Sequence, residues 1–227
     1  MLLVLAHPCD EGARFLAERW QAQGARLMVP RDLSAPGWRH HVGGGGEEWA
    51  IASGERVRVK DMTGVLVRLS GIRDQFLPHI AAFDRTYVAA EMNAFLIAWL
   101  TALTCPVLNR PAAGSILGPS LSHERWLAAA ARAGLRLAFP RHCAPYVERP
   151  QAEVQVTVVG ERWFGEVTPA LGDQAARLAR SVGADLLTAH FYGAEADAAF
   201  AGVDLLVDPT RAGVADALLS RLEGTCG

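Results

Sequence analysis

The opening of the chain constrains its fold most strongly, because it has the pattern of a strand, a helix and a second strand. The continuous apolar run 2–6 is typical of a buried parallel strand. Asp10 is a suitable N-cap for a helix over 11–23, and Gly24 would end that helix. A second strand pattern follows at 26–30. This β-α-β order predicts an α/β fold with a doubly wound, Rossmann-like sheet in the N-terminal part of the chain.

The rest of the sequence reads as further strands and helices that fall into two halves. Strand patterns cover 49–53, 56–59, 64–69, 105–108, 135–139, 153–159, 163–167, 186–191 and 203–207, and helical patterns cover 83–103, 122–133, 172–182 and 214–222. The turn at 53–55 predicts a hairpin between the first two of these strands. Three prolines within 140–150 predict a linker. We therefore predict two domains, at 1–139 and 150–227.

The composition excludes several classes of protein. The net charge of −2 gives no excess of basic residues, so neither nucleic acid nor an anionic membrane is an expected partner. No CxxC pair occurs, so neither a zinc knuckle nor a disulfide framework is expected from Cys9, Cys105, Cys143 and Cys226. The N-terminus has no basic region before its apolar run, and the apolar run 89–103 is too short to span a bilayer. We expect a cytoplasmic protein.

Three arginines form a candidate binding site. Arg68 and Arg110 each follow an apolar strand, at the edge where a parallel sheet presents its ligands, and Arg73 lies just beyond Arg68. A guanidinium group can hold a carboxylate or a phosphate through two parallel hydrogen bonds. Surface ion pairs with Asp61 or Asp74 are the alternative.

The longest helical pattern contributes a carboxylate to this candidate site. The helix over 83–103 carries an apolar stripe made of Tyr87, Ala90, Ala94, Ile97 and Ala98. Glu91 lies in the same helix and would need a cation if it were buried. We predict a basic cleft of Arg68, Arg73 and Arg110, in which Glu91 holds one of the arginines in place.

The order of the segments resembles that of a known family. The segments concerned are 64–68, 83–85, 106–111, 122–126 and 129–135 in the first half, and 154–164, 176–183 and 202–209 in the second half. The first group resembles the N-terminal domain of RimK-like ATP-grasp proteins, which include ligases that modify ribosomal peptides. The second group resembles the central hairpin, the following helix and the last core strand of their nucleotide-binding domain. The resemblance implies a Rossmann-like pre-ATP-grasp domain followed by a reduced, ATP-grasp-like α+β half.

The lysines that such a ligase uses are absent from their expected place, where two arginines are the only possible substitutes. An ATP-grasp ligase activates a carboxylate as an acyl phosphate, which requires cations beside the phosphates and acidic or amide ligands for magnesium. The family's lysines would fall within 140–152, where Arg141 and Arg149 are the only Lys or Arg residues. Lys60 is the only lysine in the chain.

The metal ligands implied by the resemblance are also replaced. The family's late metal acid would fall near His190, and its terminal Glu-x-Asn-x-Asn pattern falls on Leu206, Asp208 and Thr210. Leu206 thus replaces a carboxylate, Asp208 replaces one amide with a carboxylate, and Thr210 replaces the other amide with a hydroxyl, and a single carboxylate rarely holds catalytic Mg²⁺. The resemblance therefore implies a degenerate member, for which we assign no catalytic residue, no metal site and no cofactor.

Two short patterns have other chemical interpretations. The segment 6–11 resembles the zinc-binding motif of LmbE-like deacetylases, with His7 and Asp10 retained and Cys9 in place of an aspartate. We favour a chance match at a strand end. The glycines at 43–46 have no lysine, serine or threonine at phosphate-loop spacing, so we interpret them and the adjacent pair at 40–41 as an exposed loop.

The sequence therefore favours a non-catalytic role. We expect the protein to bind a peptide or a partner protein in a modification or biosynthetic pathway, through its N-terminal domain. The alternative is an ATP-dependent carboxylate–amine ligase of the RimK-like type, which would need ATP and Mg²⁺. A zinc-dependent hydrolase is the third hypothesis. The oligomeric state, whether monomer, homo-oligomer or hetero-oligomer, stays open.

Overall fold

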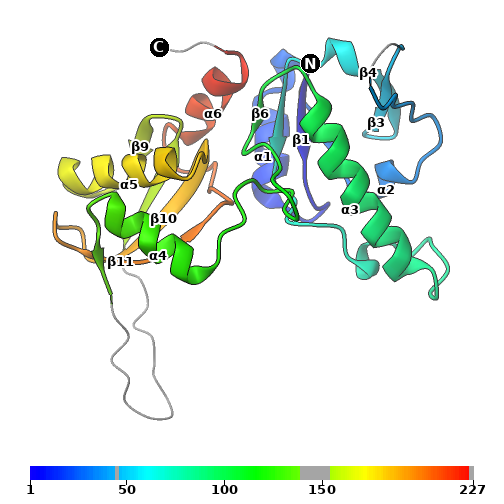
Figure 1. The fold of residues 1–227 in the computed structure, drawn as a ribbon. Coiled ribbons are helices and arrows are strands. Elements are labelled where there is room, and N and C mark those ends of the chain that lie inside the picture. The colour runs from blue at the N-terminus through cyan, green and yellow to red at the C-terminus, as the bar shows by residue number, and fades with distance from the viewer. Residues whose placement is uncertain (44–45, 139–153, 225–227) are drawn as a thin grey trace. The chain divides into compact units, whose positions relative to one another are not determined.

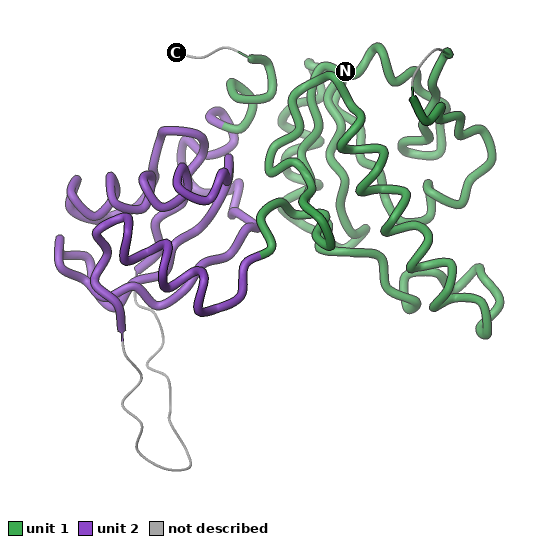
Figure 2. The backbone as a smooth tube through the Cα atoms, viewed as in Figure 1, with its two compact units in different colours: residues 1–120, 218–227 green, residues 121–217 purple. Residues whose placement is uncertain are grey.

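A computed structural model describes residues 1–43, 46–138 and 154–224. The chain divides into two compact units, which Figure 2 shows in two colours. The first unit contains residues 1–120 together with 218–227, and the second contains residues 121–217. Each unit has its own sheet and its own hydrophobic core, so each is described separately.

The sheet of the first unit has four parallel strands in the order β2-β1-β5-β6. Its strands are β1 (Leu2–Leu5), β2 (Arg26–Met28), β5 (Gly64–Val67) and β6 (Val107–Leu108). An additional antiparallel hairpin joins β3 (Trp49–Ala52) to β4 (Glu55–Arg58), as the turn chemistry predicted. The predicted α/β class with a doubly wound N-terminal sheet is confirmed.

Helices cover both faces of this sheet (Figure 1). The helix α1 (Glu11–Arg19) connects β1 to β2, and α3 (Arg85–Ala102) lies between β5 and β6. These two connections run in opposite directions along the sheet, so their right-handed crossovers place the helices on opposite faces. The shorter elements are α2 (Pro30–Leu33) and the 3₁₀ turns η1 (Gln21–Gln23), η2 (Val59–Asp61) and η3 (Asp74–Phe76).

The core of the first unit follows from strand alternation. Leu3, Leu5, Val65 and Val67 join one cluster with buried residues of α3, such as Trp99. The residues between them in β1 and β5 are buried as well and face the other side of the sheet. Burial on both faces explains why these strands are continuously apolar in sequence.

The second unit contains a mixed sheet of five strands in the order β7-β11-β10-β8-β9. Its strands are β7 (Arg136–Leu137), β8 (Val154–Val159), β9 (Arg162–Phe164), β10 (Leu186–Tyr192) and β11 (Ala199–Asp204). The helices α4 (His123–Arg132) and α5 (Pro169–Ser181) pack on one face of this sheet (Figure 1), where Phe191 and Phe200 form the centre of the core. The last helix, α6 (Val214–Leu222), is divided between the two units.

The observed division of the chain differs from the predicted domains at 1–139 and 150–227. The boundary between the compact units falls after residue 120 in the sequence. The segment from 121 to 138 belongs to the second unit, because β7 pairs with β11 and α4 packs into the second core. The predicted linker at 140–150 lies outside the described residues. The strand predicted at 203–207 was also wrong: β11 ends at Asp204, and its Phe200 packs against Phe191 in the core.

None of the helices in the described parts of the chain is both long enough and apolar enough to cross a bilayer.

Candidate functional site

The centre of the first sheet is the place where this fold positions ligands. The strands β1 and β5 are neighbours, but the chain leaves β1 toward β2 on one side and leaves β5 toward β6 on the other. Such a change of direction opens a crevice at the carboxyl ends of the two strands. The residues that follow β1 and β5, namely 6–10 and 68–73, therefore form the candidate site.

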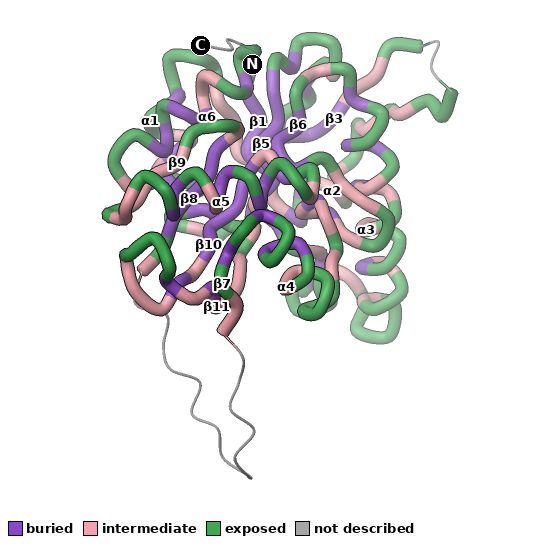
Figure 3. The backbone as a smooth tube through the Cα atoms, turned by 60° about the vertical axis from the view of Figure 1, so that its left-hand side comes forward, coloured by how far each residue is buried: buried purple, intermediate pink, exposed green. Residues whose placement is uncertain are grey.

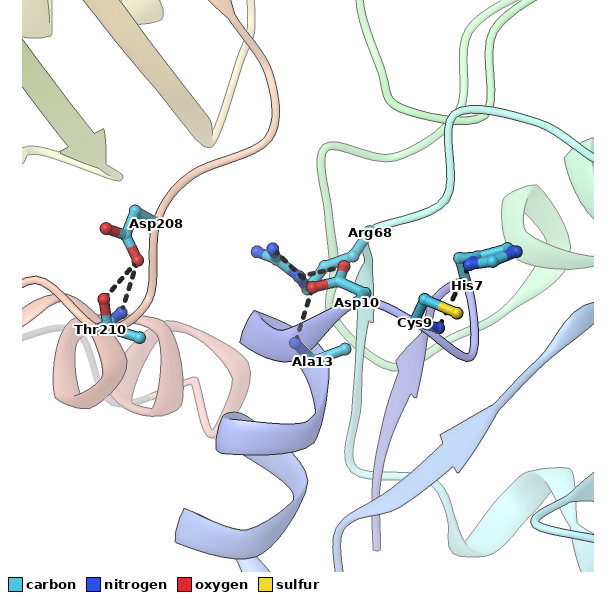
Figure 4. A network of polar contacts seen from close by, with 7 residues as sticks. All are labelled: His7, Cys9, Asp10, Ala13, Arg68, Asp208 and Thr210. Carbon is cyan, nitrogen blue, oxygen red and sulfur yellow. Dashed lines mark hydrogen bonds and ion pairs between the residues drawn. The ribbon is translucent and has the colours of Figure 1, made fainter.

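Asp10 and Arg68 meet at this edge in a bidentate ion pair (Figure 4). Arg68 donates from Nε to Oδ2 of Asp10 at 2.9 Å and from Nη2 to Oδ1 at 3.1 Å. The same Oδ1 accepts the backbone N–H of Ala13 at 2.9 Å, so Asp10 is the N-cap of α1, as predicted. The Arg68 and Asp10 side chains are only 9% and 15% exposed, so each charge depends on its partner.

A side chain of α3 fixes the loop that follows β5. The Asn93 amide accepts the backbone N–H of Ile72 at 2.7 Å and donates to the Ile72 carbonyl at 2.9 Å. It also donates to the Ala89 carbonyl at 2.8 Å. Because this loop leads directly to Arg73, Asn93 sets where that exposed cation is presented at the edge of the sheet.

His7 and Cys9 lie on the other side of the same turn. The backbone N–H of Cys9 donates to Nδ1 of His7 at 3.2 Å, and the His7 ring contacts the Phe76 ring at a centroid distance of 4.3 Å. Figure 4 shows the Asp10 carboxylate turned toward Arg68 and away from these two side chains. Among the residues that the structure describes, no three His, Cys, Asp or Glu side chains gather closely enough to hold a metal ion.

The structure does not gather the four predicted cleft residues. The guanidinium of Arg110 donates to the carbonyls of Leu100, Thr101, Leu103 and Cys105, where it caps the end of α3. Arg68 instead contacts Asp10 at the start of α1, on the opposite face of the sheet. The prediction that Glu91 holds one of these arginines was wrong, because Glu91 is exposed on α3. Arg73 is exposed as well.

The second unit has a polar patch on the sheet face opposite its helices. Thr157, Thr188 and Asp204 are cross-strand partners on β8, β10 and β11, so they share one face. The two threonine hydroxyls lie 3.3 Å apart and are buried. His190 is two residues from Thr188 on the same face, and its Nε2 lies 2.8 Å from Oδ2 of Asp204. The sequence analysis identified His190 but missed Asp204, its partner across the strands.

The residues at the positions of the terminal metal-binding pattern form a local turn. Oδ1 of Asp208 accepts the backbone N–H of Thr210 at 2.9 Å and its hydroxyl at 2.7 Å (Figure 4). Leu206 presents an exposed apolar side chain. Lys60, the only lysine, belongs to η2 of the first unit rather than to this patch.

Comparison with known proteins gives the fold but no sequence relative. No protein-family model matches the sequence, and no curated protein matches it. The macrocyclase MdnC from Microcystis aeruginosa, solved with its precursor peptide MdnA, has a TM-score of 0.73 at 12% identity, and the match covers 100% of both chains. A RiPP-associated ATP-grasp ligase from Chryseobacterium gregarium, solved with ADP and a leader and core peptide, has a TM-score of 0.71 at 11% identity, with 100% of this chain and 97% of that chain covered.

A RimK domain ATP-grasp protein from Sphaerobacter thermophilus has a TM-score of 0.55 at 15% identity, with 98% of this chain and 99% of that chain covered. The chain therefore has the fold of RimK-like, peptide-modifying ATP-grasp ligases. At the level of the fold, this confirms the family resemblance found in the sequence.

Proposed function

We propose that this protein binds a peptide or a partner protein in a peptide-modification pathway of the cytoplasm and does not catalyse ATP-dependent ligation. The observation that carries the proposal is the turn at Asp208. Its Oδ1 accepts two hydrogen bonds from Thr210, at a position where a ligase of this fold would direct acidic and amide oxygens to magnesium.

The surrounding residues support the same conclusion. Leu206 provides no metal-ligating atom, and His190 is paired with Asp204. Phosphoryl transfer depends on cations that neutralise the phosphates. The only lysine, Lys60, lies in the first unit and is exposed there.

A protein of this fold can bind a peptide even if it does not catalyse ATP-dependent ligation. The macrocyclase MdnC and the ATP-grasp ligase from Chryseobacterium gregarium were solved in complex with peptides, and the fold match extends over the whole of this chain. Recognition of a peptide requires surface and positioned polar groups, but neither phosphates nor a metal ion. Of the predicted binding residues, Arg73 is exposed and borne on a loop that Asn93 fixes, so we retain it as a contact for an acidic group.

Selection from a displayed library of random peptides tests this proposal. We expect enrichment of peptides that bind the purified full-length chain with micromolar dissociation constants, a free energy of about −8 kcal/mol. The heat-denatured chain provides the control for nonspecific binding. A library from which no peptide is enriched over that control would contradict the proposal.

One observation favours the alternative, an ATP-dependent carboxylate–amine ligase. The second sheet keeps a polar face, with the buried pair Thr157 and Thr188 beside His190 and Asp204. Formation of ADP that depends on an added peptide and amine would establish ligase activity. Peptide binding with no ADP formed supports the non-catalytic role.

A further inference from the structure

The outer face of α3 carries more apolar surface than a solvent-facing helix normally has. Phe83, just before the helix, is 87% exposed and Tyr87 is 68% exposed. Ala90, Ala94 and Ala98 continue the same face and are exposed too. Figure 3 shows exposed stretches of backbone along α3 in green. The sequence analysis placed four of these five residues on one apolar stripe; in the structure that stripe faces outward, because Leu96, Trp99 and Leu100 face the core. A helix that is apolar all round normally has a partner on each face.

This stripe ends at a hollow in the same unit. The hollow has a volume of about 580 Å³, within the range of ligand pockets. Ala98, Ala102 and Leu103 of the α3 segment line it, so the stripe leads directly into it. Val42, which is 95% exposed, belongs to the lining as well. The stripe and the hollow together provide an apolar track along the length of α3.

Most of the charges on this track are negative: Glu47 and Glu48 line the hollow, where Lys60 is the only lysine or arginine among the described lining residues. Glu91 is the only charged residue on the exposed stripe of α3, a helix that is described throughout. Arg85, the other charged residue of α3, donates to the carbonyls of Ile80 and Pro78 and is therefore directed toward the preceding loop. Asp84, next to Phe83, is exposed and adds a second carboxylate. A complementary partner would bring an apolar face and a cation.

Glu91 also argues against a second copy of this chain as the partner. An antiparallel two-fold pairing that set Tyr87 of each copy on Ala94 of the other would place the symmetry axis between Ala90 and Glu91. The two Glu91 carboxylates would then meet at the centre of the interface, where like charges repel. A different chain with a cation at that point has no such conflict.

We propose that the exposed face of α3 is the binding site for an amphipathic peptide helix whose apolar stripe contains one basic residue. The apolar side chains of the peptide lie over Tyr87 and the alanines, and one of them enters the hollow at Ala98. The basic residue pairs with Glu91. This is recognition of a helix along an apolar track, and it rests on the peptide binding proposed above.

A charge-swap titration tests the site. The probe is a fluorescent helical peptide as long as α3 (18 residues), with a leucine stripe, one arginine at the centre of that stripe, and glutamine and serine elsewhere. We expect Tyr87→Ser and Glu91→Arg each to weaken binding about tenfold, as for other central contacts and charge pairs. A peptide with glutamate in place of its arginine should bind Glu91→Arg better than it binds the native chain. Glu18→Arg, the same change on exposed α1, should leave both affinities unaltered.

The outcomes separate this inference from the proposed function. If library-selected peptides bind but ignore Tyr87→Ser and Glu91→Arg, peptide binding stands and the α3 site is overturned. If no library peptide binds, the proposed function itself fails, and the inference that rests on it fails too. A dimer in sedimentation velocity that dissociates on Tyr87→Ser would identify a second copy as the occupant and overturn the choice of partner.

Discussion

Asp10 illustrates how one side chain serves both folding and the candidate site. Its carboxylate caps α1 through the backbone N–H of Ala13 and neutralises Arg68 at the central edge of the first sheet. A helix N-terminus beside an arginine would otherwise attract an external anion. In this protein the Asp10 carboxylate is the anion at that position, so the ion pair contributes to the structure of this edge of the sheet.

Removing the Asp10 carboxylate should therefore be costly. We expect Asp10→Ala to lower the free energy of unfolding by about 2–4 kcal/mol, because it removes two charge-assisted hydrogen bonds from a buried guanidinium and removes a helix cap. Asp10→Asn keeps an oxygen for the cap and should lose about 1 kcal/mol less. Urea denaturation measures both variants. The double variant Asp10→Ala/Arg68→Met should be more stable than Asp10→Ala alone, and equal stability of the native chain and Asp10→Ala would contradict the account.

The two described cysteines should differ in reactivity. Burial raises the pKa of the Cys105 thiol, whereas Cys9 is exposed. A raised pKa means that less of the thiol is present as the reactive thiolate at neutral pH. We expect iodoacetamide to modify Cys9 first and Cys105 only as the pH rises, as followed by peptide mass spectrometry. Faster labelling of Cys105 at neutral pH would show that its surroundings are not those described.

At the scale of elements, patterns with strong local signals were predictable and long-range pairings were not. The helix predicted over 83–103 corresponds to α3, Arg85–Ala102. It was predictable because the apolar pattern extends over many residues and Pro106 follows closely. The last strand was misplaced because the apolar run 205–207 resembles a strand, whereas β11 is fixed by pairing with β10. Glu91 was expected to pair with an arginine because α3 is apolar all round, a pattern that does not indicate which face is outward.

The candidate site was predictable only in part, for the same reason. Asp10 was recognised as a cap from its position before a helix, and Arg68 from its place after a strand. Their contact spans 58 positions in sequence and exists because β1 and β5 are adjacent in the sheet. The one signal that could have found it is that each residue follows an apolar strand at the same edge of a parallel sheet.

The packing of α5 against β9 can be tested by substituting a glycine at their contact. A Cβ on Gly172 would lie 2.3 Å from the indole of Trp163, which is held by a hydrogen bond from its Nε1 to Asp173 at 3.1 Å. Overpacking outweighs the higher helix propensity of alanine, so Gly172→Ala should destabilise the protein by about 1–3 kcal/mol. Gly202→Ala on β11 is the matched control, because its Cβ meets no atom within 4 Å. Thermal unfolding should separate the two variants; equal melting temperatures would refute the packing described.

At the scale of the whole molecule, the chain combines a ligase fold with residues that do not suit ligase chemistry. The structural match to MdnC covers 100% of both chains. The residues that differ from the family's metal-binding pattern are Leu206, Asp208 and Thr210 of the second part of the chain, whereas the first unit has a parallel sheet and an exposed apolar helix face. This combination is the basis of the proposal that the protein binds a peptide or a partner without turnover.

Isothermal titration of the full-length chain with Mg-ATP tests this central claim most directly. The ATP-grasp ligase from Chryseobacterium gregarium, which was solved with ADP, serves as the positive control. We predict no heat of binding at micromolar nucleotide for this protein, because Oδ1 of Asp208 already accepts two hydrogen bonds from Thr210 and the neighbouring Leu206 offers no oxygen to Mg²⁺. A micromolar dissociation constant, about −8 kcal/mol, that is lost in Asp208→Asn would contradict the account and establish a nucleotide site.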